Sequence, residues 1–383
     1  MSRKVIARNI SYDEEKRLYY ISMDYGKNET GKRIKTSKTF KTKKEASDAL
    51  KIFEADKARS RLVLPATDSV ESFGCYWLAF EKADIRATTR YTYSVTLNNH
   101  IIPYFSGRML QSVKKEDIFK YFAHLRDDKN LSANTVRKHY SLLRSIFESA
   151  EQSEIIYVSP MKGVSVPKPA GFENTVYDLN QIIDLFRAVE GDRLELAVHL
   201  AVCLGLRRGE ICGLRWENVD LFRRTIDIID NRTMAGSVVV DGPVKSGASE
   251  RRLKIPDNLM PFLLAAKSRL DASRRILSEG FNEGDYVLCY KNGRPYRPNY
   301  LSQLFSAMLK REGLPHTRFH DMRHAHGSIA ILGAPLYDVS KSLGHSRQEI
   351  TQKIYIKDFI DVKSAAVDSV DGALKSALAV CVY

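Results

Sequence analysis

The sequence predicts a multidomain α+β protein: a small three-stranded sheet plus helix at the N-terminus, an all-α middle domain, and a mainly α third domain with a small β-hairpin or sheet. Three observations predict this organisation. Residues 4–42 alternate in short strand-like runs, whereas residues 70–152 repeat apolar positions at helical spacing. Further on, two strand-like runs near residues 240 and 254 stand among helical patterns. A chain of 383 residues has room for two or three domains.

The first domain is expected to span residues 1–62. Strand-like runs lie at 5–10, 18–23 and 34–40, turn residues lie at 25–28, and a helical pattern follows from about 43 to 60. These runs predict the three-stranded sheet backed by one helix. Residues 1–60 hold 16 Lys and Arg against 9 Asp and Glu, and so carry half of the chain's net charge of +14.

Basic and aromatic residues are interleaved along this first domain, where the aromatic residues include Tyr19, Tyr20, Tyr25 and Phe40. Such a mixture suits contacts to phosphates together with a few apolar contacts to bases. A solvated basic surface is the alternative interpretation. The candidate DNA-binding residues here are Lys32, Arg33, Lys35 and Lys38.

The middle domain is expected to span residues 66–164. Helical patterns lie at 70–82, 87–102, 113–127 and 132–152, and a capping pattern at 67–71 begins the first of them. A linker of prolines and small residues at 165–175 leads to the last domain at 176–383. Exposed basic residues on or beside the helices add the candidate DNA contacts Arg86, Arg90, Arg137 and Lys138.

Five short pieces of the last domain carry groups that one reaction needs. The first is Gly-Leu-Arg-Arg-Gly-Glu-Ile at 205–211, where the glycines let the chain turn and deliver Arg207 at a helix junction. Arg208 competes for the same role. The second piece contains Lys245, between the strand-like runs at 238–240 and 253–255, which predicts a mobile hairpin. A lysine there can be brought in when substrate binds.

The remaining three pieces follow in order along the chain. His320 and Arg323 lie three residues apart at the start of a helical run, so their side chains share one face of the helix. His345 follows a Leu-Gly pair, and Tyr355 comes ten residues later. Two arginines, a lysine, two histidines and a tyrosine predict a phosphodiester-cleaving site with a tyrosine nucleophile.

The chemistry explains why these residue types belong together. Two guanidiniums can fork onto the non-bridging oxygens of a phosphodiester and neutralise the charge that develops during attack. A free tyrosine has a pKa of about 10, so ionising it at pH 7 costs about 4 kcal/mol. Neighbouring arginines and a histidine that accepts the proton lower this cost. Lys245 is the candidate acid for the leaving 5′-oxygen. No cofactor is expected, because the reaction needs neither a metal nor ATP.

These pieces resemble the catalytic boxes of the tyrosine site-specific recombinases, most closely the phage and conjugative-transposon integrases. Order and approximate spacing agree, and the resemblance covers about residues 176–358. Several boxes in the correct order are more specific than any single one. The matched positions are the first arginine Arg207, the supporting acid Glu210, the hairpin lysine Lys245, His320 and Arg323 of the His-x-x-Arg box, His345 and the nucleophile Tyr355.

The resemblance implies an integrase that cleaves one strand at a time through a 3′-phosphotyrosyl link and exchanges strands through a four-way junction. It implies double-stranded DNA attachment sites as partners, a tetramer on DNA, and accessory DNA-bending or directionality proteins. Residues 1–62 resemble, more loosely, an arm-site DNA-binding domain. Residues 66–164 resemble the core-binding domain that clamps the duplex together with the catalytic domain.

Other interpretations stay open at this point. A type IB topoisomerase-like enzyme would cut and reseal without exchange, and a DNA-binding regulator would carry an inactive site. His320 and His324 have the spacing of a helical zinc pair, although no glutamate stands between them as a metalloprotease needs. A helical pattern at 360–380 either caps the protein's own core or docks in a neighbouring protomer.

Cysteine usage and hydropathy indicate the compartment. Five cysteines show no Cys-x-x-Cys pairing, and an odd number argues against a disulfide scaffold. No signal peptide and no apolar run near eighteen residues is found, so nothing is expected to cross a membrane. The sequence therefore predicts a reduced, cytoplasmic setting.

Overall fold

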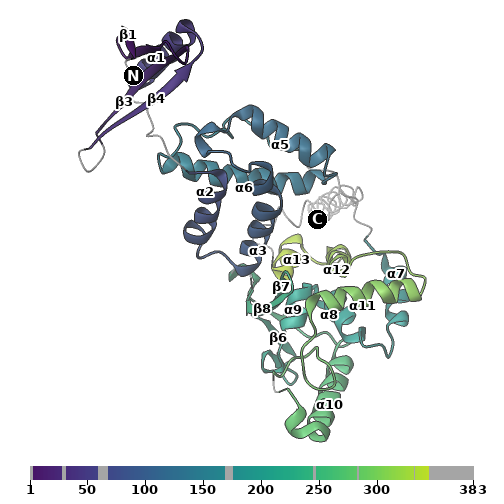
Figure 1. The fold of residues 1–383 in the computed structure, drawn as a ribbon. Helices are drawn as coiled ribbons and strands as arrows, with labels where there is room; N and C mark the ends of the chain where they lie inside the picture. Colours follow the sequence, from purple (N-terminus) through teal and green to yellow (C-terminus); the bar gives the residue numbers. More distant parts are fainter. Residues whose placement is uncertain are drawn as a thin grey trace, which may run out of the picture. The chain divides into compact units, whose positions relative to one another are not determined.

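The computed structural model describes residues 3–27, 32–58, 68–168, 176–244, 247–282, 284–331 and 333–344. The chain mixes helices and strands and divides into two compact units, Met1–Gly171 and Phe172–Tyr383 (Figure 1). The helical pattern expected at 360–380 lies outside the described residues. Within the described ranges, no helix is both long and apolar enough to span a membrane.

The N-terminal sheet has four strands, where the sequence predicted three. They run antiparallel in the order β1 (Lys4–Ala7), β2 (Ile10–Asp13), β3 (Leu18–Lys27) and β4 (Arg33–Phe40). The predicted first run at 5–10 breaks because Asn9 adopts a left-handed conformation, with φ at 65°. The resulting tight turn pairs Ala7 with Ile10, so one expected strand becomes a hairpin.

Residues 25–27, predicted as part of a turn, instead prolong β3. The register shifts between Asp24 and Gly26, which marks a bulge, and Gly26 takes φ of 93°. The remaining turn residue, 28, lies outside the described ranges. One face of the sheet is covered by α1 (Lys43–Ala58), which buries Ala46, Leu50 and Phe53 against the sheet's apolar side chains.

All four helices expected at 70–152 are present, with local breaks. The first is α2 (Val70–Tyr76) continued by a π-helical turn at Trp77–Glu81, and the second is α3 (Ala87–Thr96) continued by a π-helical turn at Leu97–Ile101 and the short α4 (Ile102–Tyr104). A 3₁₀ turn at Leu110–Ser112 precedes α5 (Lys115–Asp127), and α6 (Ala133–Gln152) completes the set. Trp77, Leu97, Tyr121 and Ile146 lie in their shared core.

The second unit is mainly helical with two small sheets. One sheet has the order β5 (Val219–Asp220), β6 (Thr225–Ile228) and β9 (Arg251–Lys254), and the other pairs β7 (Asp230–Ala235) with β8 (Val238–Pro243). Helix α8 is almost wholly buried at the centre of the core. The helices are α7 (Leu179–Ala188), α8 (Glu195–Leu204), α9 (Arg208–Gly213), α10 (Met260–Leu277), α11 (Pro298–Arg311), α12 (Asp321–Ile331) and α13 (Leu336–Leu343).

The hairpin expected to carry Lys245 is not formed as predicted. The two runs at 238–240 and 253–255 belong to different sheets: β8 pairs with β7, and β9 pairs with β6. Only Ile229 separates β6 from β7, so these two strands form one almost continuous stretch of chain. Strand β9 pairs with the first part of this stretch and β8 pairs with the second. Residues 244 and 247–250 belong to neither ladder. Local strand propensity identified both runs but could not identify their partners.

Candidate active site

A left-handed glycine positions the first arginine. Helix α8 ends at Gly205, whose φ is 63°, and Arg207 is then the N-cap of α9. A Cβ atom on Gly205 would lie 2.6 Å from the Cδ2 atom of His326 and 2.8 Å from a methyl carbon of Leu343. The turn thus needs glycine both for its backbone conformation and for the close approach of α12 and α13.

Glu210 fixes the direction of Arg207. The Glu210 carboxylate accepts a hydrogen bond from the Arg207 backbone N–H at 2.9 Å, which closes a capping box, and another from the Arg207 guanidinium at 2.6 Å. The Glu210 side chain is 2% exposed, whereas that of Arg207 is 32% exposed. The carboxylate is therefore buried beneath a guanidinium that still faces solvent.

Arg251 is a second partner of the same carboxylate. Its guanidinium donates to the two Glu210 oxygens at 2.9 Å and 3.2 Å, and its side chain is only 7% exposed. Burial acts to raise the pKa of the Glu210 carboxyl, but the hydrogen bond and charge of Arg251, and then the charge of Arg207, outweigh it. The pKa stays below its ordinary value, so Glu210 is ionised at neutral pH.

The second arginine of the predicted site comes from α12, which packs against α8. Arg323 is 2% exposed and donates to the Gly205 carbonyl at 2.7 Å and to the Leu343 carbonyl. One turn further on, the Nδ1 atom of His326 lies 2.8 Å from the Val202 carbonyl oxygen. Because a carbonyl only accepts, Nδ1 carries the proton, and His326 buttresses the turn below the arginines.

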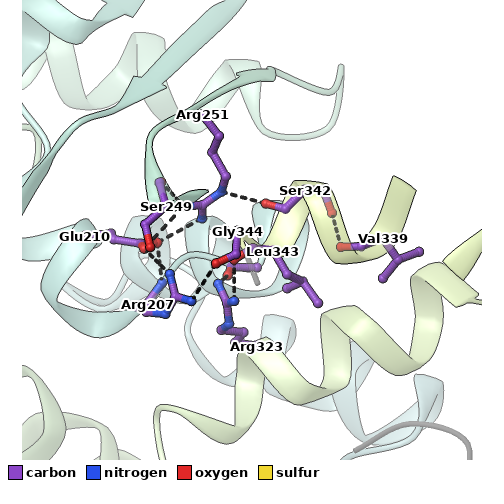
Figure 2. A network of polar contacts seen from close by, with 10 residues as sticks. Arg207, Glu210, Ser249, Arg251, Arg323, Val339, Ser342, Leu343 and Gly344 are labelled. Carbon is purple, nitrogen blue, oxygen red and sulfur yellow. Dashed lines mark hydrogen bonds and ion pairs between the residues drawn. The ribbon is translucent and has the colours of Figure 1, made fainter. Parts of the chain in front are cut away.

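Three arginines meet at the end of α13, as Figure 2 shows. The last carbonyls of a helix have no partner within the helix. Here Arg251 donates to Ser342 at 2.6 Å, Arg323 donates to Leu343, and Arg207 donates to Gly344 at 3.2 Å. Each of three consecutive carbonyls is thus bound by a different guanidinium.

His320 lies directly before α12, at the edge of this cluster. Its ring contacts that of His324 edge to face, with centroids 5.3 Å apart. The residue is exposed to solvent, although neighbouring protein partly encloses and desolvates its ring. This enclosure, followed by the charges of His324 and Arg323, lowers the pKa of His320 to about 4. The ring is therefore neutral at pH 7 and able to accept a proton.

Arg207 and His320 line the same cleft, which has a volume of about 550 Å³. Arg208 also lines it, but its guanidinium donates to the Ser302 hydroxyl of α11 at 2.8 Å and is not bound to Glu210. The other residues of the cleft include three basic side chains and several hydroxyls; the basic ones are Arg232, His316 and Arg318.

The structure brings together four of the predicted site residues: Arg207, Glu210, His320 and Arg323. Lys245, His345 and Tyr355 lie outside the described residues. The described chain ends next to the site all the same, because the carbonyl that Arg207 binds belongs to Gly344.

Arg251 is the site residue that the sequence interpretation missed as an active participant. A signal was available in the strand alternation of β9. Arg251 and Leu253 share the more buried face, whereas Arg252 and Lys254 are exposed. An arginine on the inward face of a strand requires an acidic partner, and Glu210 is that partner.

The candidate DNA-binding residues of the N-terminal sheet fall on both of its faces. Lys38 pairs with the buried Ile21 and so lies on the face that α1 covers. Lys35 pairs with Asp24 on the opposite face. Arg33 lies on that open face too and forms an ion pair with Asp24 at 2.6 Å. Lys32 is exposed just before β4.

Two basic residues expected to contact DNA from the middle helices, Arg90 and Arg137, bind backbone carbonyls of the protein. Arg90 donates to the carbonyls of Lys82 and Ala83, and Arg137 donates to the Pro167 carbonyl at 2.8 Å. Arg86 is exposed at the N-cap of α3, and Lys138 is exposed on α6. Arg137 and Lys138 line a groove with side chains of α3, among them Thr88, Thr89 and Thr92.

Three consecutive parts of the chain match known protein families. Residues 174–360 match the phage integrase family, residues 9–57 match an arm DNA-binding domain, and residues 78–156 match the N-terminal SAM-like domain of phage integrases. This chain belongs to the phage integrase family. The family consists of tyrosine recombinases, so the integrase is an enzyme of site-specific DNA recombination.

Similar proteins extend over nearly the whole integrase. The tyrosine recombinase XerC-like protein of Caldanaerobacter subterraneus subsp. tengcongensis is 25% identical, covering 96% of this chain and 99% of its own. The ICEBs1 integrase of Bacillus subtilis is 25% identical, covering 93% of this chain and 97% of its own.

Among solved structures, the Tn1549 transposon integrase bound to a circular intermediate DNA has a TM-score of 0.68 at 16% identity, over 79% of this chain and all of the other. A lambda integrase tetramer bound to a Holliday junction has a TM-score of 0.57 at 16% identity, over 92% of this chain and 96% of the other. These likenesses establish the fold.

Proposed function

We propose that this integrase cleaves and rejoins duplex DNA through Tyr355, with Arg207 holding the scissile phosphate and Arg323 stabilising the charge that develops on it. The observation that carries the proposal is the convergence of both guanidiniums on the end of α13, at the carbonyls of Gly344 and Leu343. His345 is the next residue, and Tyr355 follows ten residues later. The two arginines therefore lie where the segment with the nucleophile begins.

In the proposed reaction the phenolic oxygen of Tyr355 attacks phosphorus, and the bond from phosphorus to the 5′-oxygen of the next nucleotide breaks. His320, neutral at pH 7, accepts the tyrosine proton. Lys245 donates a proton to the leaving 5′-oxygen. The 3′-phosphate stays bonded to Tyr355, and attack by the 5′-hydroxyl of a second strand reverses each step. His345 donates a hydrogen bond to the phosphate.

The two arginines have different proposed tasks. Arg207 keeps about a third of its side chain exposed at the cleft, so its guanidinium can fork onto the non-bridging oxygens. Arg323 is covered by protein and stabilises the developing negative charge from behind. Glu210 fixes the direction of Arg207 and does not touch substrate.

We assign residues 1–62 to arm-site binding, 66–164 to core-site binding, 165–175 to the linker and 176–383 to catalysis. The family matches at 9–57, 78–156 and 174–360 support this division. Candidate DNA contacts in the first two domains are the basic residues Lys32, Arg33, Lys35, Lys38, Arg86, Arg90, Arg137 and Lys138.

We also propose double-stranded attachment sites as the substrate and a tetramer on DNA as the assembly. Among the similar structures, the Tn1549 integrase is in complex with a circular intermediate DNA and the lambda integrase is a tetramer bound to a Holliday junction. Accessory DNA-bending or directionality proteins would assist, and the enzyme would act in the bacterial cytoplasm on chromosomal or mobile-element DNA.

The test uses the full chain and its own junction DNA, nicked so that the cut fragment diffuses away. After incubation in EDTA, mass spectrometry of the tryptic peptides identifies any covalent DNA adduct. We expect an adduct on Tyr355, none in Tyr355→Phe, and the normal adduct in Tyr337→Phe, since Tyr337 is an exposed tyrosine on α13.

Two other outcomes would change the assignment. A protein that binds its cognate site tightly but forms no adduct is a DNA-binding regulator with an inactive site. A protein that forms the adduct and relaxes supercoiled DNA, yet never joins strands from two attachment sites, acts like a type IB topoisomerase.

A further inference from the structure

Arg251 connects the end of α13 with Glu210, the carboxylate that directs Arg207. Its Nε atom donates to the Ser342 carbonyl of α13 at 2.6 Å, and its terminal nitrogens donate to both oxygens of Glu210. A further bond, at 3.1 Å, runs to the Ser249 carbonyl just before β9 (Figure 2). No step of the proposed reaction uses this side chain.

The first consequence concerns charge. Glu210 paired with Arg207 alone would cancel the positive charge of the arginine that faces the cleft. Because Arg251 also binds the carboxylate, the buried pair of Glu210 and Arg251 is close to neutral by itself. Three guanidiniums and one carboxylate then leave a net charge of +2 around the phosphate position. Phosphoryl transfer adds negative charge to the phosphate, which this excess favours.

The second consequence concerns position. The end of α13 is the described point nearest in sequence to His345 and Tyr355. Arg251 ties Ser342 to the same carboxylate that directs Arg207, so a single side chain links the helix end to the phosphate-binding arginine. A planar guanidinium can make these contacts together because its donors point in fixed directions.

We infer that Arg251 is a positioning residue of the reaction: it neutralises Glu210 so that Arg207 keeps its charge for the phosphate, and it fixes the end of α13 relative to Arg207. This inference rests on the proposed function. Arg251 acts through Glu210 and the end of α13, so its removal slows cleavage and leaves the DNA affinity of the integrase nearly unchanged.

The experiment compares four variants of the full chain on nicked attachment-site DNA: Arg251→Met, Glu210→Gln, the double variant, and Arg252→Met. Arg252 is a matched control because it is the next residue of β9 and also pairs with a carboxylate, Asp227, but is 69% exposed. The single-turnover cleavage rate at saturating DNA, the Kd for DNA and the thermal midpoint are measured for each variant.

Arg251→Met is expected to cleave about 100-fold more slowly with DNA affinity within about threefold of the parent, the scale of coupled charge networks. The double variant is expected to cleave at least about tenfold faster than Arg251→Met, because removing the carboxylate restores the charge of Arg207. Arg252→Met should match the parent. A residue that acted only by packing would give no such rescue.

Several results would overturn the inference. One is cleavage by Arg251→Met as fast as by Arg252→Met, and another is a double variant as slow as Arg251→Met or slower. If Arg251→Met does not fold, Arg251→Lys, which keeps the charge and reaches one partner, must cleave more slowly than the parent with unchanged affinity; an unchanged rate would exclude the role. Absence of any adduct on Tyr355 in the parent would instead remove the proposed function, and this role with it.

Discussion

The carbonyl of Gly205 accepts a hydrogen bond of 2.7 Å from the guanidinium of Arg323, which lies 118 positions further along the chain. Gly205 is also the residue whose left-handed turn delivers Arg207 two residues later. One glycine thus sets the position of both arginines: by its backbone conformation for Arg207 and by its carbonyl for Arg323.

Gly205→Ala should therefore damage the site as well as the fold. Its Cβ would press on His326 and Leu343, and its backbone would be strained at positive φ. Strain alone costs about 1–2 kcal/mol, and the clash adds about 1–3 kcal/mol. We expect unfolding in urea at a lower concentration and single-turnover cleavage slowed by more than about tenfold.

Gly191→Ala is the control for this substitution. Gly191 lies in the same unit, has φ of 68°, and nothing stands within 4 Å of its added Cβ. Gly191→Ala should be destabilised only by backbone strain and should cleave at the parent rate. Equal losses of stability and rate in both variants would show that contacts with α12 and α13 are unimportant.

His320 should not limit cleavage near pH 6.5, where an ordinary histidine titrates. Enclosure by protein, then the charges of His324 and Arg323, lower its pKa to about 4. Its neutral form, the proton acceptor, is therefore fully populated from pH 8 down to pH 6. The single-turnover cleavage rate of the parent should not change with pH over this range. The rate of His316→Gln, a variant changed elsewhere in the cleft, should not change either. A half-loss of rate near pH 6.5 in both proteins would contradict this role for His320.

Much of the fold was predictable because helices are local. The four helices of the middle domain followed from apolar spacing within each segment, and Ser132 begins α6 as its N-cap. Strand partners were not predictable to the same degree. The segment Asp230–Ala235 has no apolar alternation, yet it forms β7 and takes β8 as its partner. The break at Asn9 depended on one residue adopting positive φ.

In the candidate site, too, local features were predictable from the sequence and long-range contacts were not. Short motifs placed Arg207 and Glu210 on one turn of chain, and the structure brings them together with Arg323 and His320. The role of Arg251 was not readable from a motif, because its partners Glu210 and Ser342 lie 41 and 91 positions away. Alternation with Leu253 marks Arg251 as the inward arginine of β9, but the carboxylate and the carbonyl that it meets are set by tertiary structure.

His139 should make the first unit less stable in acid. Its ring is 2% exposed, and its Nδ1 atom lies 2.8 Å from the Tyr121 hydroxyl. Burial, followed by the charge of His100, lowers the pKa of His139 from 6.5 to about 4. Between these two pKa values the unfolded chain binds a proton at His139 and the folded chain does not. The contribution of neutral His139 to the free energy of unfolding is therefore present above pH 6.5 and is lost as pH falls toward 4. The loss between pH 7 and pH 5 is about 2 kcal/mol.

The measurement uses one of the two tryptophans as a reporter of this unit. In a Trp216→Phe background, the fluorescence of the buried Trp77 follows urea unfolding of the helical core. His139→Gln, which can still form a hydrogen bond with Tyr121, should flatten the pH dependence. Part of the slope should remain, because burial also lowers the pKa of His100. An identical slope in both proteins would show that another group is responsible.

Lys35 and Lys38 lie on opposite faces of the N-terminal sheet, so substitutions at the two positions can show which face contacts DNA. Lys35 lies on the open face with Arg33, and Lys38 lies on the face that α1 covers. If the open face enters DNA, Lys35→Ala should weaken arm-site binding and lower the slope of log affinity against log salt by about 0.9, the value for one lost phosphate contact. Lys38→Ala removes the same charge and should change the slope by less. Fluorescence anisotropy over a salt series measures both. Equal slopes in the two variants would mean that the sheet attracts DNA through its total charge, with neither face docked against the phosphates.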